Sequence, residues 1–84
     1  MPLYQSHKKV SAMKIGAIEF EQDGSAVIAP ASIHAKYGNR KTGPGYRERF
    51  KGDEEDLGYY VRYADNYESW SPTKAFEEGY TLVD

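Results

Sequence analysis

The residues best suited to bind a ligand lie between positions 36 and 51, where aromatic and basic side chains alternate. An aromatic ring can stack on a nucleobase, while a guanidinium or ammonium group beside it pairs with phosphate. The segment therefore indicates a site for an anionic ligand, either a nucleotide or a nucleic acid. Its candidate residues are Tyr37, Arg40, Lys41, Tyr46, Arg47 and Arg49.

The charge distribution leaves a second interpretation of this segment open. Residues 34–51 hold six Lys and Arg against one Glu, whereas residues 52–84 hold nine Asp and Glu against two basic residues. The basic stretch could thus be a solvated loop that the acidic residues neutralise. A general DNA-binding domain is basic overall, so a net charge of −2 favours a small anionic ligand in a local pocket over duplex DNA.

A second candidate site lies on a hairpin predicted in the last third of the chain. Tyr60, Arg62 and Tyr67 are expected on its solvent-facing side, and tyrosine and arginine are enriched at the energetic centres of protein interfaces. This face predicts a protein-binding site. Two alternatives remain for this face: it could form a dimer interface, or the N-terminal segment around Leu3 and Tyr4 could cover it.

Catalytic chemistry has little support in the sequence. The chain has no cysteine, and its two histidines, His7 and His34, have no zinc-site spacing. Neither histidine lies beside a nucleophile on a predicted rigid element. Glycines surround Lys41 as in a phosphate-binding loop, but the Walker spacing is absent. We expect a protein without catalytic activity, cofactor or metal.

The 84 residues predict one small domain, residues 1–84, with a loose N-terminus over residues 1–8. A domain of this size buries only about 60–65% of its unfolded surface, and 14% of the residues are aromatic. A homo-oligomer or a partner protein is therefore expected. No long apolar run predicts a signal peptide or membrane span, and a cytoplasmic location is expected.

The first hairpin is predicted around Asp23 and Gly24, a pair suited to a two-residue loop because both central residues of such a loop need positive φ. With that loop Phe20 lies opposite Val27. The pattern of apolar residues breaks at Gly16, which predicts a bulge or bend in the first strand.

The second hairpin is predicted with Asp65 and Asn66 as its loop, which places Val61 opposite Trp70. Directly opposed residues share a face, so one face is predicted to be the core side. That core face comprises Tyr59, Val61, Tyr63 and Trp70.

A short helix is predicted directly after the second hairpin. Ser71 is its expected N-cap, Pro72 its first residue and Gly79 the residue that follows its end. Residues 80–83 predict a final edge strand. Phe76 is expected to fold back onto the sheet.

Residues 32–57 form a basic and acidic insertion in this scheme. One or two helical turns are expected at residues 32–37 and a short strand at residues 46–50, with a solvated acidic turn at residues 53–56. The predicted fold is α+β: a small antiparallel sheet of four or five strands with two β-hairpins, one short C-terminal helix and a long basic loop.

The C-terminal segment resembles a group of small phage and prophage accessory proteins that have no assigned activity, and the first hairpin is also similar. The resemblance spans about half of the chain and leaves out the basic segment. It implies a phage origin and transfers no catalytic or binding residue. The matching positions are Tyr59, Tyr60, Val61, Tyr63, Asp65, Tyr67, Ser69, Trp70, Ser71, Pro72, Ala75, Phe76, Glu77, Gly79 and Tyr80.

Small phage proteins often act by binding host proteins. We therefore expect a non-enzymatic phage-type binding protein in the host cytoplasm, which inhibits or redirects a host protein by occupying its surface. The alternative is a protein that sequesters a nucleotide or binds nucleic acid through residues 36–51.

Overall fold

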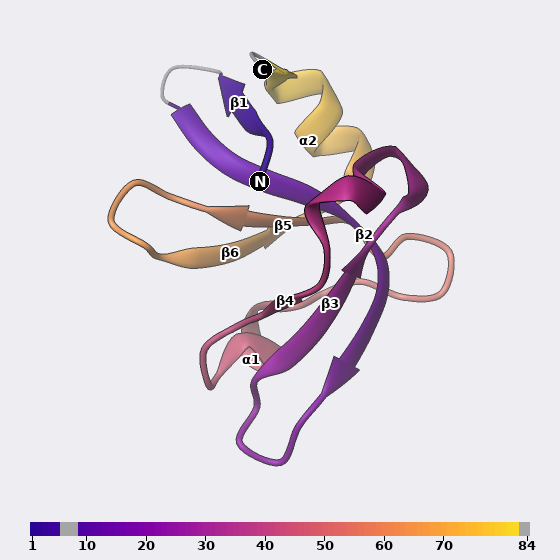
Figure 1. Ribbon diagram of the computed structural model, residues 1–84, viewed down its shortest axis with the longest axis vertical. Coiled ribbons are helices and arrows are strands. Elements are labelled where there is room, and N and C mark those ends of the chain that lie inside the picture. Colours follow the sequence, from indigo (N-terminus) through magenta and orange to yellow (C-terminus); the bar gives the residue numbers. More distant parts are fainter. Residues whose placement is uncertain (6–8, 83–84) are drawn as a thin grey trace.

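The computed structural model describes residues 1–5 and 9–82 and confirms an α+β fold on an antiparallel sheet. Seven strands, two α-helices and a 3₁₀ helix make up the described part (Figure 1). Their bounds are β1 (Leu3–Gln5), β2 (Lys9–Phe20), β3 (Ala26–Pro30), η1 (Ser32–Tyr37), β4 (Arg40–Lys41), α1 (Tyr46–Arg49), β5 (Tyr59–Arg62), β6 (Glu68–Ser71), α2 (Thr73–Gly79) and β7 (Thr81–Leu82).

Strand β2 organises the whole sheet. Its first half pairs with β1 and β5, and its second half pairs with β3, all antiparallel. The register shifts between Ile15 and Ala17, which confirms the bulge predicted at Gly16. A Cβ at Gly16 would lie 2.7 Å from the Pro30 carbonyl oxygen, so only glycine permits this approach of the two strands.

The N-terminal residues belong to the sheet, and the prediction of a loose N-terminus was wrong for residues 3–5. Strand β1 pairs with both β2 and β7. Tyr4 is buried and its ring packs at 4.7 Å from the ring of Phe76, which fixes this strand to α2. Residues 6–8, the rest of that prediction, lie outside the described residues.

Both hairpins have loops one residue longer than predicted. The Glu21 N–H donates to Ser25 and the Tyr63 N–H to Tyr67, which leaves three residues in each loop. The third loop residue is left-handed in both, with φ of 85° at Gly24 and 71° at Asn66. This is the three-residue hairpin loop with a bulge.

The longer loops shift both predicted registers by one position. Phe20 pairs with Ala26 rather than Val27, and Val61 pairs with Ser69 rather than Trp70. A shift of one residue moves side chains to the other face of a strand pair. Trp70 therefore lies opposite Tyr60.

Each face of the sheet has its own hydrophobic cluster, because adjacent residues of β2 and β5 are buried on opposite sides. The cluster beneath α2 contains Tyr4, Val10, Ala12, Tyr59, Val61 and Phe76. The cluster on the opposite face contains Met13, Ile15, Ala26, Ile28, Tyr46 and Tyr60, with Trp70 packed against it.

The basic and acidic segment builds part of the second cluster. The predicted strand at residues 46–50 was wrong: Tyr46–Arg49 is the short helix α1, closed by a bond from the Phe50 N–H to the Tyr46 carbonyl. Gly45, with φ of 92°, turns the chain into it. The helical turn predicted at residues 32–37 is present as η1.

Helix α2 begins one residue later than predicted, because Ser71 is the last residue of β6. The N–H of its first residue is capped from a distance. Asp56 accepts hydrogen bonds from the Thr73 N–H at 3.2 Å and from the Thr73 hydroxyl at 2.6 Å. The predicted final strand is present as β7 over the described residues.

Candidate functional site

The loop between β5 and β6 projects Tyr67 into solvent. The Asp65 carboxylate accepts the Tyr67 N–H at 3.0 Å, and Asn66 takes the left-handed conformation. An aspartate that binds the N–H two residues later is a common turn device. The backbone of Tyr67 is held by this turn, while its side chain is 49% exposed.

The predicted protein-binding face is only partly available. Tyr60 is fully buried at 0% exposure, so the expectation that it faces solvent was wrong. Both faces of β5 are covered, and the register shift puts Trp70 beside Tyr60 in the second cluster. Arg62 is half-buried and donates to the Asn66 side-chain oxygen at 3.4 Å.

Tyr60 instead joins two segments of the fold. Its hydroxyl donates to Glu68 at 2.5 Å and accepts from the Arg40 Nε at 3.2 Å. The other Glu68 oxygen accepts the Gly43 N–H at 2.8 Å. Burial raises the pKa of Tyr60 to about 12, which keeps its hydroxyl protonated and able to donate.

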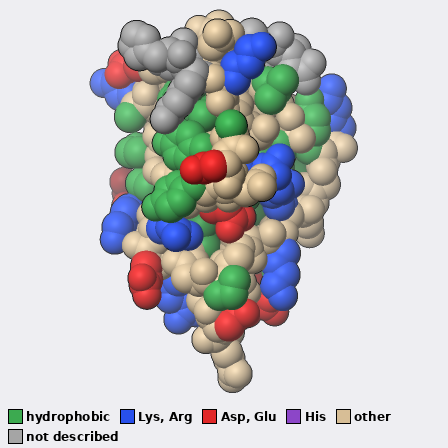
Figure 2. All heavy atoms as spheres, turned by 90° about the vertical axis from the view of Figure 1, so that its left-hand side faces the viewer, with side chains coloured by type: hydrophobic (Ala, Val, Ile, Leu, Met, Phe, Trp, Pro, Cys, Tyr) green, Lys and Arg blue, Asp and Glu red, His purple; other side chains and the backbone are tan. Residues whose placement is uncertain are grey.

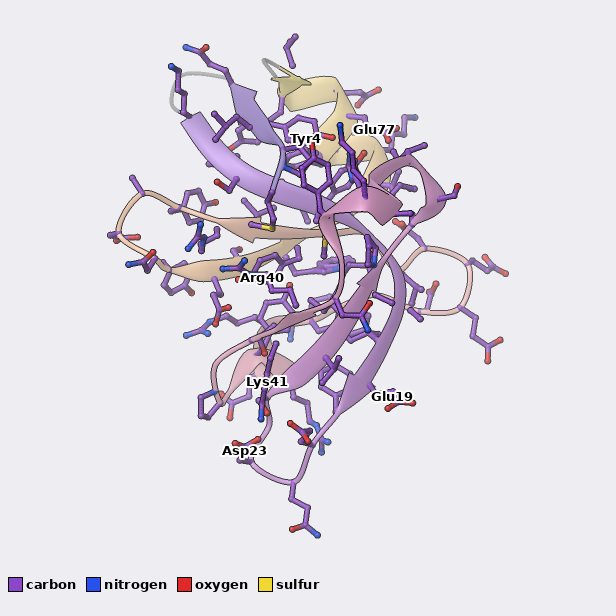
Figure 3. The ribbon with its side chains drawn as sticks, viewed as in Figure 1. Tyr4, Glu19, Asp23, Arg40, Lys41 and Glu77 are labelled. Atoms are coloured by element: carbon purple, nitrogen blue, oxygen red, sulfur yellow. The ribbon has the colours of Figure 1, made fainter. Side chains whose placement is uncertain are left out.

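The predicted anionic-ligand residues do not converge on one pocket. Arg40 and Arg49 lie against the β5–β6 hairpin, since the Arg49 guanidinium is 4.7 Å from the centre of the Tyr67 ring. Lys41 and Arg47 lie against the β2–β3 turn. Figure 3 shows the separation, with Arg40 beside the hairpin and Lys41 near Asp23.

Two aromatic members of that predicted site serve the fold. Tyr46 is fully buried, and its hydroxyl donates to the Ser69 carbonyl at 2.8 Å. Burial raises the pKa of Tyr46 above its ordinary value. Tyr37 is half-buried, with its ring 6.1 Å from that of His34. A base could not stack on Tyr46 without unfolding α1.

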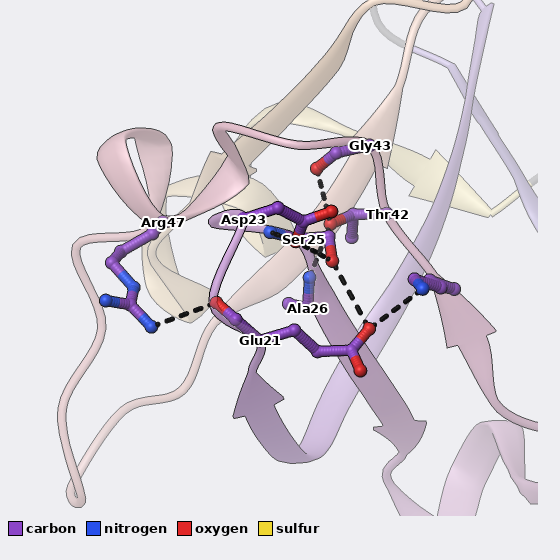
Figure 4. Close-up of polar contacts among 8 residues, drawn as sticks. Glu21, Asp23, Ser25, Ala26, Thr42, Gly43 and Arg47 are labelled. Carbon is purple, nitrogen blue, oxygen red and sulfur yellow. Dashed lines mark hydrogen bonds and ion pairs between the residues drawn. The ribbon is translucent and has the colours of Figure 1, made fainter.

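The Lys41 and Arg47 group stabilises a turn (Figure 4). Lys41 forms an ion pair with Glu21 at 2.9 Å, and Arg47 donates to the Glu21 carbonyl at 3.3 Å. The Ser25 hydroxyl donates to Asp23 at 2.6 Å. Lys41 is therefore neutralised by Glu21, a residue outside the acidic stretch that the alternative interpretation invoked, whereas Arg47 bonds a neutral backbone carbonyl.

One surface at the β5–β6 loop combines members of both predicted sites with Lys9 of β2. A cleft of about 560 Å³ is lined there by Lys9, Tyr63, Ala64, Asp65 and Tyr67. The rings of Tyr63 and Tyr67 are 6.1 Å apart. We call this region the tip surface; it comprises Lys9, Arg49, Arg62, Tyr63, Ala64, Asp65 and Tyr67.

The tip surface is positive and aromatic. It contains three cations, Lys9, Arg49 and Arg62, and one carboxylate, Asp65, which accepts the Tyr67 N–H. The Glu68 carboxylate, opposite Arg62, is bonded to Tyr60 and Gly43. Figure 2 looks onto the side of the molecule where this hairpin lies, and shows hydrophobic side chains gathered among basic and acidic ones. Such a surface can bind an acidic partner around an aromatic anchor.

Sequence reasoning found Arg62, Tyr67 and Arg49 but assigned them to two sites, and it missed Lys9 and Tyr63. Lys9 reaches the hairpin because β2 pairs with β5, with Ser11 opposite Arg62. A pairing between strands about 50 residues apart has no local signal. Tyr63 was assigned to the core, where its ring does pack at the edge of the first cluster.

A further set of polar contacts lies where β1 meets α2. The His34 Nδ1 accepts the Lys14 N–H at 3.0 Å, and its Nε2 lies 3.3 Å from the Tyr4 hydroxyl. The Tyr59 hydroxyl donates to Glu77 at 2.7 Å. Figure 3 shows Tyr4 and Glu77 together where β1 meets α2. These residues bond one another within the fold, so we assign them a structural role.

Fold and site together define a small α+β domain with a cationic, aromatic surface at the tip of one hairpin. Comparison with protein-family models, curated proteins and solved structures finds no significant match. Among the described residues no three His, Asp or Glu side chains are grouped as metal ligands. No helix in the described ranges is long and apolar enough to cross a membrane.

Proposed function

We propose that this chain is a non-enzymatic binding protein that occupies a surface on another protein through its tip surface. The observation that supports this most is Tyr67, 49% exposed beside the cleft and covered on one side by Arg49. An exposed tyrosine that follows a firmly bonded turn and is stacked by an arginine of α1 loses little conformational freedom when it binds, which favours affinity.

The charge of the tip surface defines the chemistry of the partner. Lys9, Arg49 and Arg62 complement an acidic protein surface, and the Tyr63–Tyr67 cleft accepts an apolar side chain from it. The resemblance to phage accessory proteins makes a host protein of the bacterial cytoplasm the proposed partner. Occupation of its surface would inhibit or redirect it.

Sequestration of a nucleotide by residues 36–51 has less support. Tyr46 is buried, and the four basic residues of that candidate site divide between two places on the molecule. The capture experiment described next is therefore designed to detect bound nucleotide as well as bound protein.

The test compares capture of host protein by matched variants. The tagged chain is mixed with host lysate at near-physiological salt, and the bound fraction is examined for protein and for absorbance by nucleotide. We expect Tyr67→Ala and Arg49→Ala each to weaken capture of a specific protein at least tenfold, because hot-spot residues contribute about 2 kcal/mol or more.

Lys41→Ala and Arg47→Ala are the controls, since they remove the same charge from the β2–β3 turn. They should leave capture unchanged. Loss of capture in the controls but not in the tip variants, or a bound fraction containing nucleotide alone, would contradict the proposal.

A further inference from the structure

The described surface contains an acidic counterpart to the tip surface. Asp53, Glu54 and Glu55 are all exposed at the apex of the loop between α1 and β5. We call these three residues the acidic loop. Figure 1 shows this loop and the β5–β6 loop projecting from opposite sides of the molecule.

The acidic loop is held in one shape by its own hydrogen bonds. The backbone groups of Asp53 and Asp56 bond each other in both directions, at 3.1 and 3.2 Å. The Asp53 carboxylate also accepts the N–H groups of Glu55 and Asp56, each at 3.0 Å. Asp56 is bonded in turn to Thr73 and Gly58. The two apical glutamates are therefore presented by an ordered turn.

The apical glutamates keep their charge available for a partner. Among the described residues the one ion pair joins Lys41 to Glu21, so neither Glu54 nor Glu55 is held in an ion pair. The cations of the tip surface and the carboxylates of the acidic loop are opposite in sign, and of those carboxylates Asp53 is already bonded to the Glu55 and Asp56 N–H groups.

We propose that the acidic loop of one copy of this chain occupies the tip surface of a second copy. The contact joins two different surfaces, so it is head-to-tail, and because these lie on opposite sides it extends to further copies instead of closing into a dimer. This inference uses the same surface as the proposed function, and a host target would compete with the second copy for it.

Association is measured as the weight-average mass by sedimentation equilibrium over a range of concentrations up to about 1 mM, since contacts made of exposed ion pairs are weak. At low salt the mass of the wild-type chain should rise with concentration and pass that of a dimer. At about 1 M salt, where the screening length falls to roughly 3 Å, it should return to the monomer.

Two charge-reversed variants identify the surfaces involved. Glu54→Lys/Glu55→Lys reverses the loop and Lys9→Glu/Arg49→Glu reverses the tip, all at exposed positions. Each variant alone should stay monomeric, and an equal mixture should associate again. Glu19→Lys/Glu78→Lys changes the net charge by the same amount as the loop variant at other exposed positions, and it should associate like the wild type.

A wild-type chain that stays monomeric at low salt overturns the inference. So does a reversed variant that associates as strongly as the wild type, or a mixture of the two variants that stays monomeric. The loop variant separates the two proposals. It should keep its capture of host protein while it loses self-association, whereas failure of the proposed function would appear as absent capture by the wild-type chain itself.

Discussion

Burial determines which tyrosine of the second hairpin can take part in recognition. Tyr60 and Tyr67 are of the same residue type, yet their exposed fractions are 0% and 49%. The hydroxyl of Tyr60 is fully used between Glu68 and Arg40. Substitution of Tyr60 would therefore test stability, and substitution of Tyr67 tests binding.

His34 should make the stability of the fold depend on pH. Its Nδ1 accepts the Lys14 N–H, so the neutral ring carries its proton on Nε2 and protonation of Nδ1 would break that bond. Burial, and next the nearby charge of Lys14, lower the pKa of His34 below 6.5. The unfolded chain then binds the proton more readily than the folded chain.

Stability from His34 is therefore complete above about pH 6.5 and is lost as pH falls toward the lower folded-state pKa. In that window the free energy of unfolding should drop by up to about 1.4 kcal/mol per pH unit. Urea unfolding at pH 7.5 and 5.5 measures it. His34→Gln, which cannot titrate, should flatten this dependence; an unchanged slope in His34→Gln would refute this account.

At the scale of elements, the hairpin loops determine which faces are core. Asn66 has φ of 71°, a conformation that costs a residue with a Cβ about 1–2 kcal/mol unless its side chain compensates. Asn66→Gly should keep the wild-type free energy of unfolding, and Asn66→Ala should be about 1 kcal/mol less stable than the glycine variant. Chemical unfolding compares the two, and equal stabilities would show that this conformation is not held in solution.

Asp56 should stabilise the fold more than its acidic neighbours do. It accepts three hydrogen bonds, from the Thr73 N–H and hydroxyl and from the Gly58 N–H. Loss of these bonds at a helix start predicts that Asp56→Ala lowers the free energy of unfolding by about 2 kcal/mol. Glu55→Ala, which removes a carboxylate from the same loop, should change it by less than about 0.5 kcal/mol. Similar effects of both substitutions would contradict the long-range cap.

The hydrogen bonds of Asp56 also give its contribution a pH window. The Thr73 hydroxyl is the main cause that lowers the pKa of Asp56 below 3.8. Its contribution is therefore present above about pH 3.9 and is lost as pH falls below that value. This window is separate from that of His34.

The sequence predicted the elements better than their registers. Alternating apolar residues and the Asp-Gly and Asp-Asn pairs located both hairpins, and Gly16 marked the bulge correctly. The loop length could not be read from the sequence, because one left-handed Gly or Asn suits a three-residue loop as well as a two-residue loop. The difference of one residue in loop length shifted the register. It moved Tyr60 from the predicted solvent-facing side into the second cluster, and Trp70 to the same face as Tyr60.

Long-range contacts explain the other differences between the predicted and the observed elements. Asp56 caps α2 from 17 positions away in sequence. Tyr46 is fixed in a helix, against its β propensity, by a bond to Ser69. Neither contact leaves a local sequence pattern. The sequence therefore assigned Asp56 to a solvated turn and Tyr46 to a ligand site, whereas both stabilise the fold.

The whole molecule is one bent sheet with a hydrophobic cluster on each face, joined by β2. Because both faces are covered near the centre, no broad sheet face is left for a partner there. The chemistry suited to recognition lies where the hairpin extends beyond the clusters, on the tip surface. The acidic loop lies on the opposite side (Figure 1), which gives the molecule two ends of opposite charge.

Site-specific photo-crosslinking tests most directly that the tip surface binds protein. p-Benzoylphenylalanine is placed at Tyr67 and, as a control, at Ile33, which is more exposed at 64% but belongs to η1. After irradiation in the host cell, the variant at position 67 should yield a crosslinked protein that the variant at position 33 does not. Crosslinks to that protein from position 33 alone, or from neither position, would contradict the assignment of the tip surface.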